Sequence, residues 1–283
     1  MRILRYLTLF ALVLQGQDVT LPLKANSVRF AAIGDMGTGQ AAQYQVAQRM
    51  LLFHQKFPFN FVITLGDNIY GGGSPTELER KFEIPYKPLL DVGVQFYAAL
   101  GNHDDTNQRF YKFFNMNGQQ YYTFKKENVR FFALDSNYMD PKQLIWLEKE
   151  LANAGSEWKI CFFHHPLYSS GEKHGPSLEL RKVLEPLLMK NGVDVVFAGH
   201  EHFYERIKPQ NGIQYFILGN SAKLRKGGIA TSEITAKGFD TDNAFMIAEI
   251  TGDEMSFQTI SRKGTVIDSG KFRRAERKAA TND

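Results

Sequence analysis

The chain repeats one pattern over most of its length: short apolar runs alternate with longer segments that have helical periodicity. Seven runs rich in Val, Ile and Phe are typical of buried strands: VRFAAI, FNFVITL, VQFYAAL, VRFFAL, KICFF, VDVVFA and IQYFIL. Segments 41–55, 141–154 and 177–191 between them space their apolar residues as amphipathic helices do. Continuous apolar strands that alternate with helices indicate sheets covered by helices, so the pattern predicts an α/β fold.

The rest of the chain is consistent with one large domain. The 283 residues include 43% hydrophobic residues, which is enough for a sizeable core. No Pro-, Gly- or Ser-rich linker divides the chain, and FMIAEI, MSFQTIS and the stretch around Val266 predict closing antiparallel strands. We therefore expect one domain over residues 26–272.

The two ends of the chain differ from this domain. Residues 1–16 place Arg2 and Arg5 before a nine-residue apolar run, which is typical of an export signal and too short to span a bilayer comfortably. We therefore expect export to a periplasm or out of the cell, with no stable membrane partner after cleavage. An uncleaved anchor or an ordinary first strand is the alternative. Residues 273–283 form a basic tail that we interpret as a solvated end. Since the net charge is only +4, no nucleic-acid partner is expected.

Five of the predicted strands end in side chains that bind metals or transfer protons, four of them after a glycine. These strand ends carry Asp35, Asp67 with Tyr70, Asn102 with His103 and Asp104, His164 with His165, and His200 with His202. Because ligands bind at the carboxyl ends of strands in open α/β sheets, these residues stand where a site is expected.

Each motif is weak by itself, because Gly-Asp after a strand is usually a turn and His-x-His alone seldom binds metal. Together, five coincidences at the same end of five strands are hard to explain as turns. Carboxylates, an amide and imidazoles suit two hard-to-borderline divalent or trivalent metals. Asp67 and Tyr70 could face the same ion if the chain enters a helical turn after its strand.

In order, the five motifs resemble those of the dinuclear metallophosphoesterases: GD at 34–35, GDNIY at 66–70, GNHD at 101–104, HHP at 164–166 and GHEH at 199–202. The tyrosine in GDNIY resembles the small purple acid phosphatases, also called tartrate-resistant acid phosphatases. The resemblance covers residues 28–260 and implies a four-layer αββα sandwich of two mixed sheets flanked by helices.

The resemblance also implies a ligand set for the first metal and for the bridge. Asp35, Tyr70 and His202 would bind a ferric ion, and Asp67 would bridge it to the second metal. The second metal would be iron, zinc or manganese.

For the second metal, the resemblance implies Asn102, His164 and His200 as ligands. His164 takes the ligand place because the family spacing is His-x-Pro, and the role of its neighbour His165 stays open.

Three further residues would act on the substrate. His103 would stabilise the transition state and protonate the leaving group, while Asp104 would orient its ring. His174 resembles a second histidine of the family's substrate pocket, although its spacing from His164 is one residue longer than in the mammalian enzymes.

The resulting hypothesis is an acid phosphatase that hydrolyses phosphate monoesters, either small esters or phosphoproteins, by in-line attack of a metal-bound hydroxide on phosphorus. A phosphodiesterase or nucleotidase could use the same ligands. A metal- or phosphate-binding protein without catalysis is the alternative from another class, and the intact His103 and Asp104 argue against it. The oligomeric state is not determined by the sequence.

Overall fold

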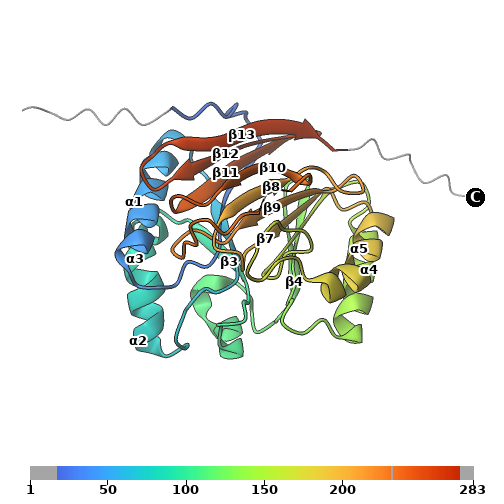
Figure 1. Cartoon of the computed structure of the whole chain (residues 1–283), viewed down its shortest axis with the longest axis horizontal. Helices are drawn as coiled ribbons and strands as arrows, with labels where there is room; N and C mark the ends of the chain where they lie inside the picture. The colour runs from blue at the N-terminus through green and yellow to red at the C-terminus, as the bar shows by residue number, and fades with distance from the viewer. Residues whose placement is uncertain (1–17, 231, 275–283) are drawn as a thin grey trace, which may run out of the picture.

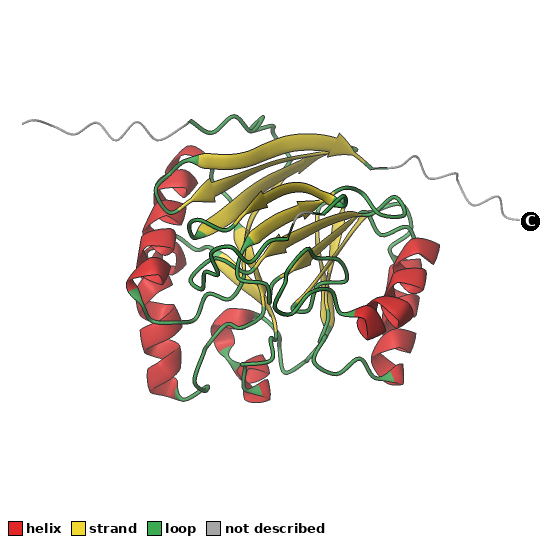
Figure 2. Cartoon of the chain, viewed as in Figure 1, coloured by secondary structure: helices red, strands yellow, loops and turns green. Residues whose placement is uncertain are grey.

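Two mixed β-sheets lie face to face and are flanked by helices in the computed structural model, which describes residues 18–230 and 232–274 (Figure 1, Figure 2). The six-stranded sheet has the order β13 (Val266–Arg273), β12 (Glu254–Ser261), β11 (Ala244–Thr251), β1 (Val28–Ile33), β2 (Phe61–Leu65) and β3 (Gln95–Ala99). The seven-stranded sheet has the order β10 (Thr235–Phe239), β8 (Tyr204–Ile207), β9 (Gln214–Leu218), β7 (Val195–Ala198), β6 (Trp158–Phe163), β5 (Val129–Ala133) and β4 (Tyr122–Lys126).

Parallel pairing places the predicted site motifs at common sheet edges. In the six-stranded sheet, β1 pairs parallel with β2 and β2 with β3, while β11, β12 and β13 close the sheet antiparallel. In the other sheet, β5, β6, β7 and β9 are parallel neighbours. The carboxyl ends of β1, β2 and β3 therefore share one edge, and those of β6 and β7 share another.

The helices cover the two outer faces. α1 (Ala41–Lys56) and α3 (Ile84–Asp91) pack on the six-stranded sheet, while α4 (Pro141–Asn153) and α5 (Leu178–Lys190) pack on the seven-stranded sheet (Figure 2). The segment between β2 and α3 adds the short α2 (Pro75–Leu78) and the π-helical turn η1 (Glu79–Glu83), and two 3₁₀ turns follow β3, η2 (Thr106–Phe110) and η3 (Lys112–Phe114). This confirms the predicted αββα sandwich.

The inner faces of the two sheets hold an aromatic core. Phe30 of β1 stacks on Phe61 and meets Phe131 and Phe197 of the opposite sheet edge-to-face, with centroids 5.4 and 6.0 Å away. These rings are fully or almost fully buried. Burying such side chains contributes about 1.5–3 kcal/mol each, so this layer fixes how the two sheets sit on each other.

The sequence missed β4, β8 and β10, which are short edge or near-edge strands with mixed polarity. The predicted export signal, residues 1–16, lies outside the described residues. β13 extends to Arg273, one residue into the segment assigned to the basic tail, and Arg274 donates a hydrogen bond to Asp253. In residues 18–230 and 232–274, no helix is long and apolar enough to cross a membrane.

Candidate metal centre

Five strand ends, three from one sheet and two from the other, meet at one place. The amide of Asp35, after β1, donates to the carbonyl of Gly66, after β2, at 3.0 Å. The amide of Gly199, after β7, donates to the carbonyl of His164, after β6, also at 3.0 Å. The two edges join where the amide of His200 donates to Asp35 Oδ2 at 2.8 Å.

Glycine is required in these loops because the backbones approach so closely. A Cβ on Gly101 would lie 2.2 Å from the Asp67 amide nitrogen. A Cβ on Gly66, whose φ is +84°, would lie 2.6 Å from Nδ1 of His164. Real Cβ atoms do not come this near, so the glycines in the sequence motifs exist to let the strand ends converge.

Asp35, Tyr70 and His202 form the first cluster of predicted ligands. The Tyr70 hydroxyl donates to Asp35 Oδ1 at 3.0 Å and lies 3.4 Å from His202 Nε2. His202 Nε2 is 3.2 Å from the same Asp35 oxygen. Three atoms that could each bind a metal ion, from three different loops, therefore lie close together.

Asn102, His164 and His200 form the second cluster. His164 Nε2 lies 3.0 Å from Asn102 Oδ1 and 3.1 Å from His200 Nδ1. His164 Nδ1 lies 2.8 Å from the Leu65 carbonyl, which can only accept, so the proton is on Nδ1. Nε2 then presents its lone pair to the cluster, as in a histidine whose second nitrogen is held for metal binding.

Asp67 lies between the two clusters. Its carboxylate lies within 4.8 Å of the ligand atoms of Asp35 and His202, and Asp67 Oδ1 is 3.4 Å from His164 Nε2. The same oxygen accepts a hydrogen bond from the His103 amide at 3.0 Å. This position is the one required of a side chain that would bridge two ions.

Three of the predicted ligands have left-handed backbone conformations, with φ of 52° at Asp35, 53° at Asp67 and 70° at His200. Such conformations are uncommon for residues other than glycine and cluster at functional sites. The predicted helical turn after Asp67 is not present. Instead, the chain bends at Gly66 and Ile69, and the amide of Tyr70 donates to the Gly37 carbonyl at 2.9 Å. This places both side chains toward one cluster.

Burial and mutual proximity set the protonation of the cluster. Burial, followed by the charge of His164, lowers the pKa of His200 to about 2, and burial with Arg225 lowers the pKa of His202 to about 4. These imidazoles are neutral near pH 7, which is the form that binds metals. Burial, with the nearby carboxylates Asp35 and Asp67, raises the pKa of the Tyr70 phenol. A bound cation would reverse that shift.

The donor set therefore fits two metal ions. The residues described here supply carboxylate oxygens, a phenol, an amide oxygen and neutral imidazoles, all directed inward, and Asp67 reaches both clusters. Such a set suits iron, zinc or manganese better than Ca²⁺ or a structural zinc.

His165, whose role the sequence left open, lies beside the second cluster. One of its ring nitrogens can join a group with nitrogens of His164 and His200, while Nδ1 lies 2.9 Å from Ser136 Oγ. Its ring centroid is 4.5 Å from that of His200. The contact to Ser136 holds this ring from outside the cluster, and no motif in the sequence indicated it.

His103 and His174 are both exposed. The His103 ring packs against Tyr70, with centroids 4.9 Å apart. The His174 ring lies 4.4 Å from His200. Both rings therefore border the two clusters while staying open to solvent, as groups that meet a substrate must.

Asp104 corrects one expectation. Its carboxylate accepts hydrogen bonds from the amides of Gly101, Asn68 and Ile69 and from the side chains of Asn68 and Gln108, at 2.8–3.1 Å. Among the hydrogen bonds of the described residues, none joins it to the His103 ring. Asp104 ties the loop after β2 to the loop after β3, so it shapes the site through the backbone instead of orienting that ring.

Two cations at the site were not predicted. Arg225 Nη1 binds the buried Glu201 at 3.0 Å, and Lys223 Nζ lies 4.4 Å from the centroid of the Tyr70 ring. Both stand in the segment KLRKGG after β9, a strand parallel to β7. A cationic segment after a further parallel strand of the same sheet was the available signal.

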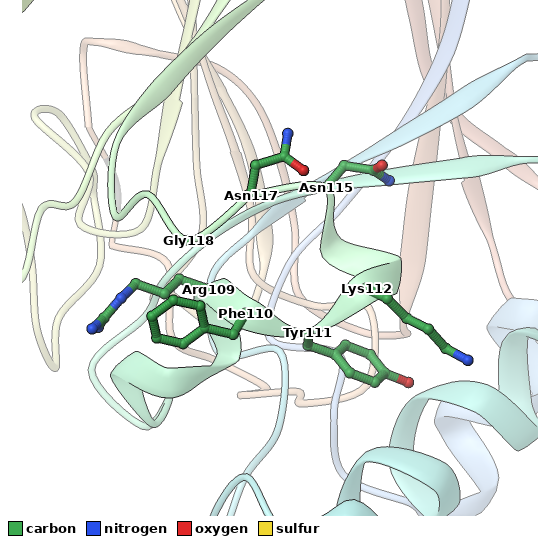
Figure 3. A pocket seen from close by; sticks show the side chains of 7 residues that line it. All are labelled: Arg109, Phe110, Tyr111, Lys112, Asn115, Asn117 and Gly118. Carbon is green, nitrogen blue, oxygen red and sulfur yellow. The ribbon is translucent and has the colours of Figure 1, made fainter.

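A pocket near η2 and η3 lies outside the cluster (Figure 3). Figure 3 shows Phe110, Tyr111 and Lys112 at its wall, and the Arg109 guanidinium lies 4.5 Å from the Phe110 ring centroid. None of the residues that line it is a predicted ligand. The predicted chemistry is therefore not in this pocket, although it begins six residues after His103.

Residues 28–204 match the family model described as calcineurin-like phosphoesterase. The chain belongs to this family. It is 28% identical over 270 residues to purple acid phosphatase 17 of Arabidopsis thaliana, covering 81% of this chain and 80% of the relative. It is 26% identical to tartrate-resistant acid phosphatase type 5 of Homo sapiens, covering 92% and 97%. The resemblance predicted from the motifs and the prediction of a metal-dependent hydrolase are confirmed.

A solved structure with the same fold illustrates that the fold alone does not determine function. GAP50, described as the anchor in the inner membrane complex of Plasmodium, superposes with a TM-score of 0.78 at 21% identity and covers 89% of this calcineurin-like phosphoesterase and 90% of its own chain. At this identity the likeness shows the shared fold only. Function has to be argued from the side chains at the strand ends.

Proposed function

We propose that this calcineurin-like phosphoesterase is an acid phosphatase that hydrolyses phosphate monoesters at a dinuclear metal centre. The observation that carries the proposal is the convergence of seven predicted ligands, from five strand ends, on two adjoining clusters that share Asp67. The relatives named acid phosphatase support the same reading.

Asp35, Tyr70 and His202 would hold Fe(III), and Asn102, His164 and His200 would hold iron, zinc or manganese, with Asp67 shared. When bound, the two cations supply Lewis-acid chemistry, because they neutralise charge on the phosphate and make water a better nucleophile. The phenol of Tyr70 favours a ferric ion, since a hard, highly charged cation offsets the cost of ionising a buried phenol.

The chain's own groups would handle orientation and protons. His164 is held by the Leu65 carbonyl, and the loop of His103 is held by Asp67 and Asp104. His103, exposed at the rim beside Tyr70, would donate to the oxygen of the leaving group.

His174 Nε2 lies 3.2 Å from Arg225 Nη2, which can only donate. His174 would therefore meet the substrate through Nδ1, where its proton resides. Burial and the charge of Arg225 also lower the pKa of His174, which favours its neutral form, a weak proton donor. This leaves His103 as the better candidate for the proton transfer.

The proposal is tested on the purified full chain with a monoester and a diester aryl phosphate, 4-nitrophenyl phosphate and bis(4-nitrophenyl) phosphate. We expect the monoester to be hydrolysed faster, activity to vanish with a chelator and to return with added iron and zinc. Faster diester cleavage would favour the phosphodiesterase alternative. Metal binding without hydrolysis of either ester would favour a non-catalytic binding protein.

Export is proposed with this function, with small phosphate esters or phosphoproteins outside the cytoplasm as substrates. It rests on the arginine-led apolar run of residues 1–16. Sequencing the amino terminus of the mature protein after cell fractionation tests it. We expect a shortened chain in the exported fraction, and an uncleaved chain confined to the cytosol would contradict the proposal.

A further inference from the structure

The segment after β9 is fastened to the backbone of two predicted ligands. The amide of Lys223 donates to the Asp35 carbonyl at 3.2 Å, and the amide of Arg225 donates to the His202 carbonyl at 2.9 Å. The side chain of Asn243 donates to the Lys223 carbonyl at 2.8 Å. Lys223 and Arg225 are therefore held at the first cluster by the main chain, so their positions are part of the site.

The charge of Arg225 is already balanced. Its Nη1 binds Glu201 Oε2 at 3.0 Å, and Glu201 is fully buried. The other oxygen of Glu201 accepts the amides of His174 and Gly175 at 3.1 and 2.6 Å. Arg225 thus serves to fix the His174 loop, and its removal would leave a buried carboxylate without its partner.

Lys223 differs from Arg225 because its charge is not balanced by a carboxylate. Within residues 18–230 and 232–274, no ion pair involves its ammonium group. Its Nζ lies over the face of Tyr70, 4.4 Å from the ring centroid. Lys81, which contacts the Tyr70 carbonyl, is instead paired with Glu77. Lys223 is half-buried and adds to the lowering of the pKa of His202, after burial and Arg225, so its field reaches the cluster.

We propose that Lys223 is a specificity-determining residue that binds a second phosphate group of the substrate while the first occupies the metal centre. The substrate class is then a phosphoanhydride or a bisphosphate, of which water cleaves one P–O bond. With pyrophosphate the products are two phosphates. A lysine suits this task because its ammonium is a compact charge on a flexible stem and a common phosphate ligand.

The inference rests on the proposed phosphatase function and deepens it. Phosphate oxygens in contact with two metal ions have little need of another cation. A second phosphate beside them would meet Arg225, whose charge Glu201 already balances, and Lys223, whose charge no carboxylate of the described residues balances. A half-buried ammonium is screened less by salt than a surface lysine, so its effect on affinity is larger. The Tyr70 face holds the ammonium near the centre until the second phosphate arrives.

The test compares Lys223→Met with Lys226→Met in the full-length, metal-loaded protein. Lys226 is exposed in the same segment, three residues further on, and serves as the matched control. The ratio of kcat/KM for pyrophosphate to that for phenyl phosphate is measured. We expect Lys223→Met to lower this ratio about tenfold, Lys223→Arg to restore most of it and Lys226→Met to leave it unchanged. An unchanged ratio in Lys223→Met would overturn the inference.

A binding measurement separates this inference from the proposed function. Calorimetry gives the affinities of inorganic pyrophosphate and inorganic phosphate for the metal-loaded wild type and for Lys223→Met. We expect the preference for pyrophosphate to fall about tenfold in the variant, whether or not either ester is hydrolysed. Absence of hydrolysis in the wild type would refute the phosphatase proposal alone, whereas equal loss of affinity for both anions would refute the role of Lys223.

Discussion

The six-stranded sheet supplies the site with oxygen atoms, and the seven-stranded sheet supplies it with nitrogen atoms. From the ends of β1, β2 and β3 come Asp35, Asp67, Tyr70 and Asn102, and from the ends of β6 and β7 come His164, His200 and His202. Each proposed ion would take ligands from both sheets. The centre is therefore a product of sheet packing, and neither sheet holds a complete ligand set.

The two sides also differ in their electrostatics. Burial and the neighbouring Asp67 raise the pKa of Asp35, against the opposing charge of His164, while burial lowers the pKa of His200 and His202. Both shifts oppose charge in a dry environment, and a cation between the sheets removes the penalty on the oxygen side. The oxygen ligands therefore depend most on the metal for their charged form. The nitrogen ligands are the groups that acid would protonate at the greatest cost.

The largest expected effect comes from deleting one ligand on each side. Asp67→Ala and His200→Ala should each lose metal and at least about 10³-fold in kcat/KM, because a shared centre loses its Lewis-acid clamp from either side. Metal content by elemental analysis and aryl phosphate hydrolysis are measured together. Asp91→Ala, an exposed aspartate of α3, is the control. Retention of metal and activity by either ligand variant would contradict a centre that needs ligands from both sheets.

A second expected effect is acid sensitivity on the nitrogen side of the metal-free protein. Burial, followed by the charge of His164, lowers the pKa of His165 to about 4, below its value of about 6.5 in an unfolded chain. Between these values the unfolded chain binds a proton that the folded chain does not. The contribution of neutral His165 to the free energy of unfolding is therefore complete above about pH 6.5 and is lost as the pH falls to about 4. The loss is at most about 3 kcal/mol.

Urea unfolding of the metal-free wild type and of His165→Gln across this pH range measures that effect. We expect the variant to show the flatter profile, whereas His54→Gln on α1, a more exposed histidine, should change the slope less. Parallel profiles for the wild type and His165→Gln would show that acid does not act through this ring.

Metal should also stabilise the sandwich as a whole. A ligand present at 100 times its Kd stabilises the folded state by about 2.7 kcal/mol if it does not bind the unfolded chain. Thermal unfolding with and without metal should show this rise in the wild type and in Asp91→Ala, and little of it in Asp67→Ala or His200→Ala. A full rise in His200→Ala would mean that the oxygen side binds metal alone.

The smallest expected effect concerns Tyr70, which bears on the oxidation state of the first ion more than on its binding. A phenolate on ferric iron absorbs visible light, so Tyr70→Phe should lose a visible band while it keeps its metal through the remaining ligands. Activity should fall about tenfold or less, since one of several ligands is lost. An iron-loaded wild type without such a band would show that Tyr70 is only part of the turn.

Much of the fold and of the site was readable from the sequence because the pattern is regular where it matters. VRFAAI and KICFF lie in strands that are almost entirely buried, and they are apolar apart from Arg29 and Lys159. The Gly-Asp or His that follows each run marks the strand end. β10, whose sequence TAKGF lies at a sheet edge, is largely exposed and carries no such signal. The loop after β2 also deviated from its predicted helical turn, because Asp67 adopts a left-handed conformation to face the cluster.

The sequence by itself determined which side chains stand at the ends of strands, since that is a matter of order along the chain. Tertiary structure decided what those side chains meet. Asp104 binds the amides of a loop more than 30 residues away, and Lys223 lies over a ring more than 150 residues away. Such pairs depend on the closing of β9 beside β7 and on two sheets packed through their aromatic faces. The spacing of residues along the chain does not predict these contacts, because they depend on packing across the whole interface between the sheets.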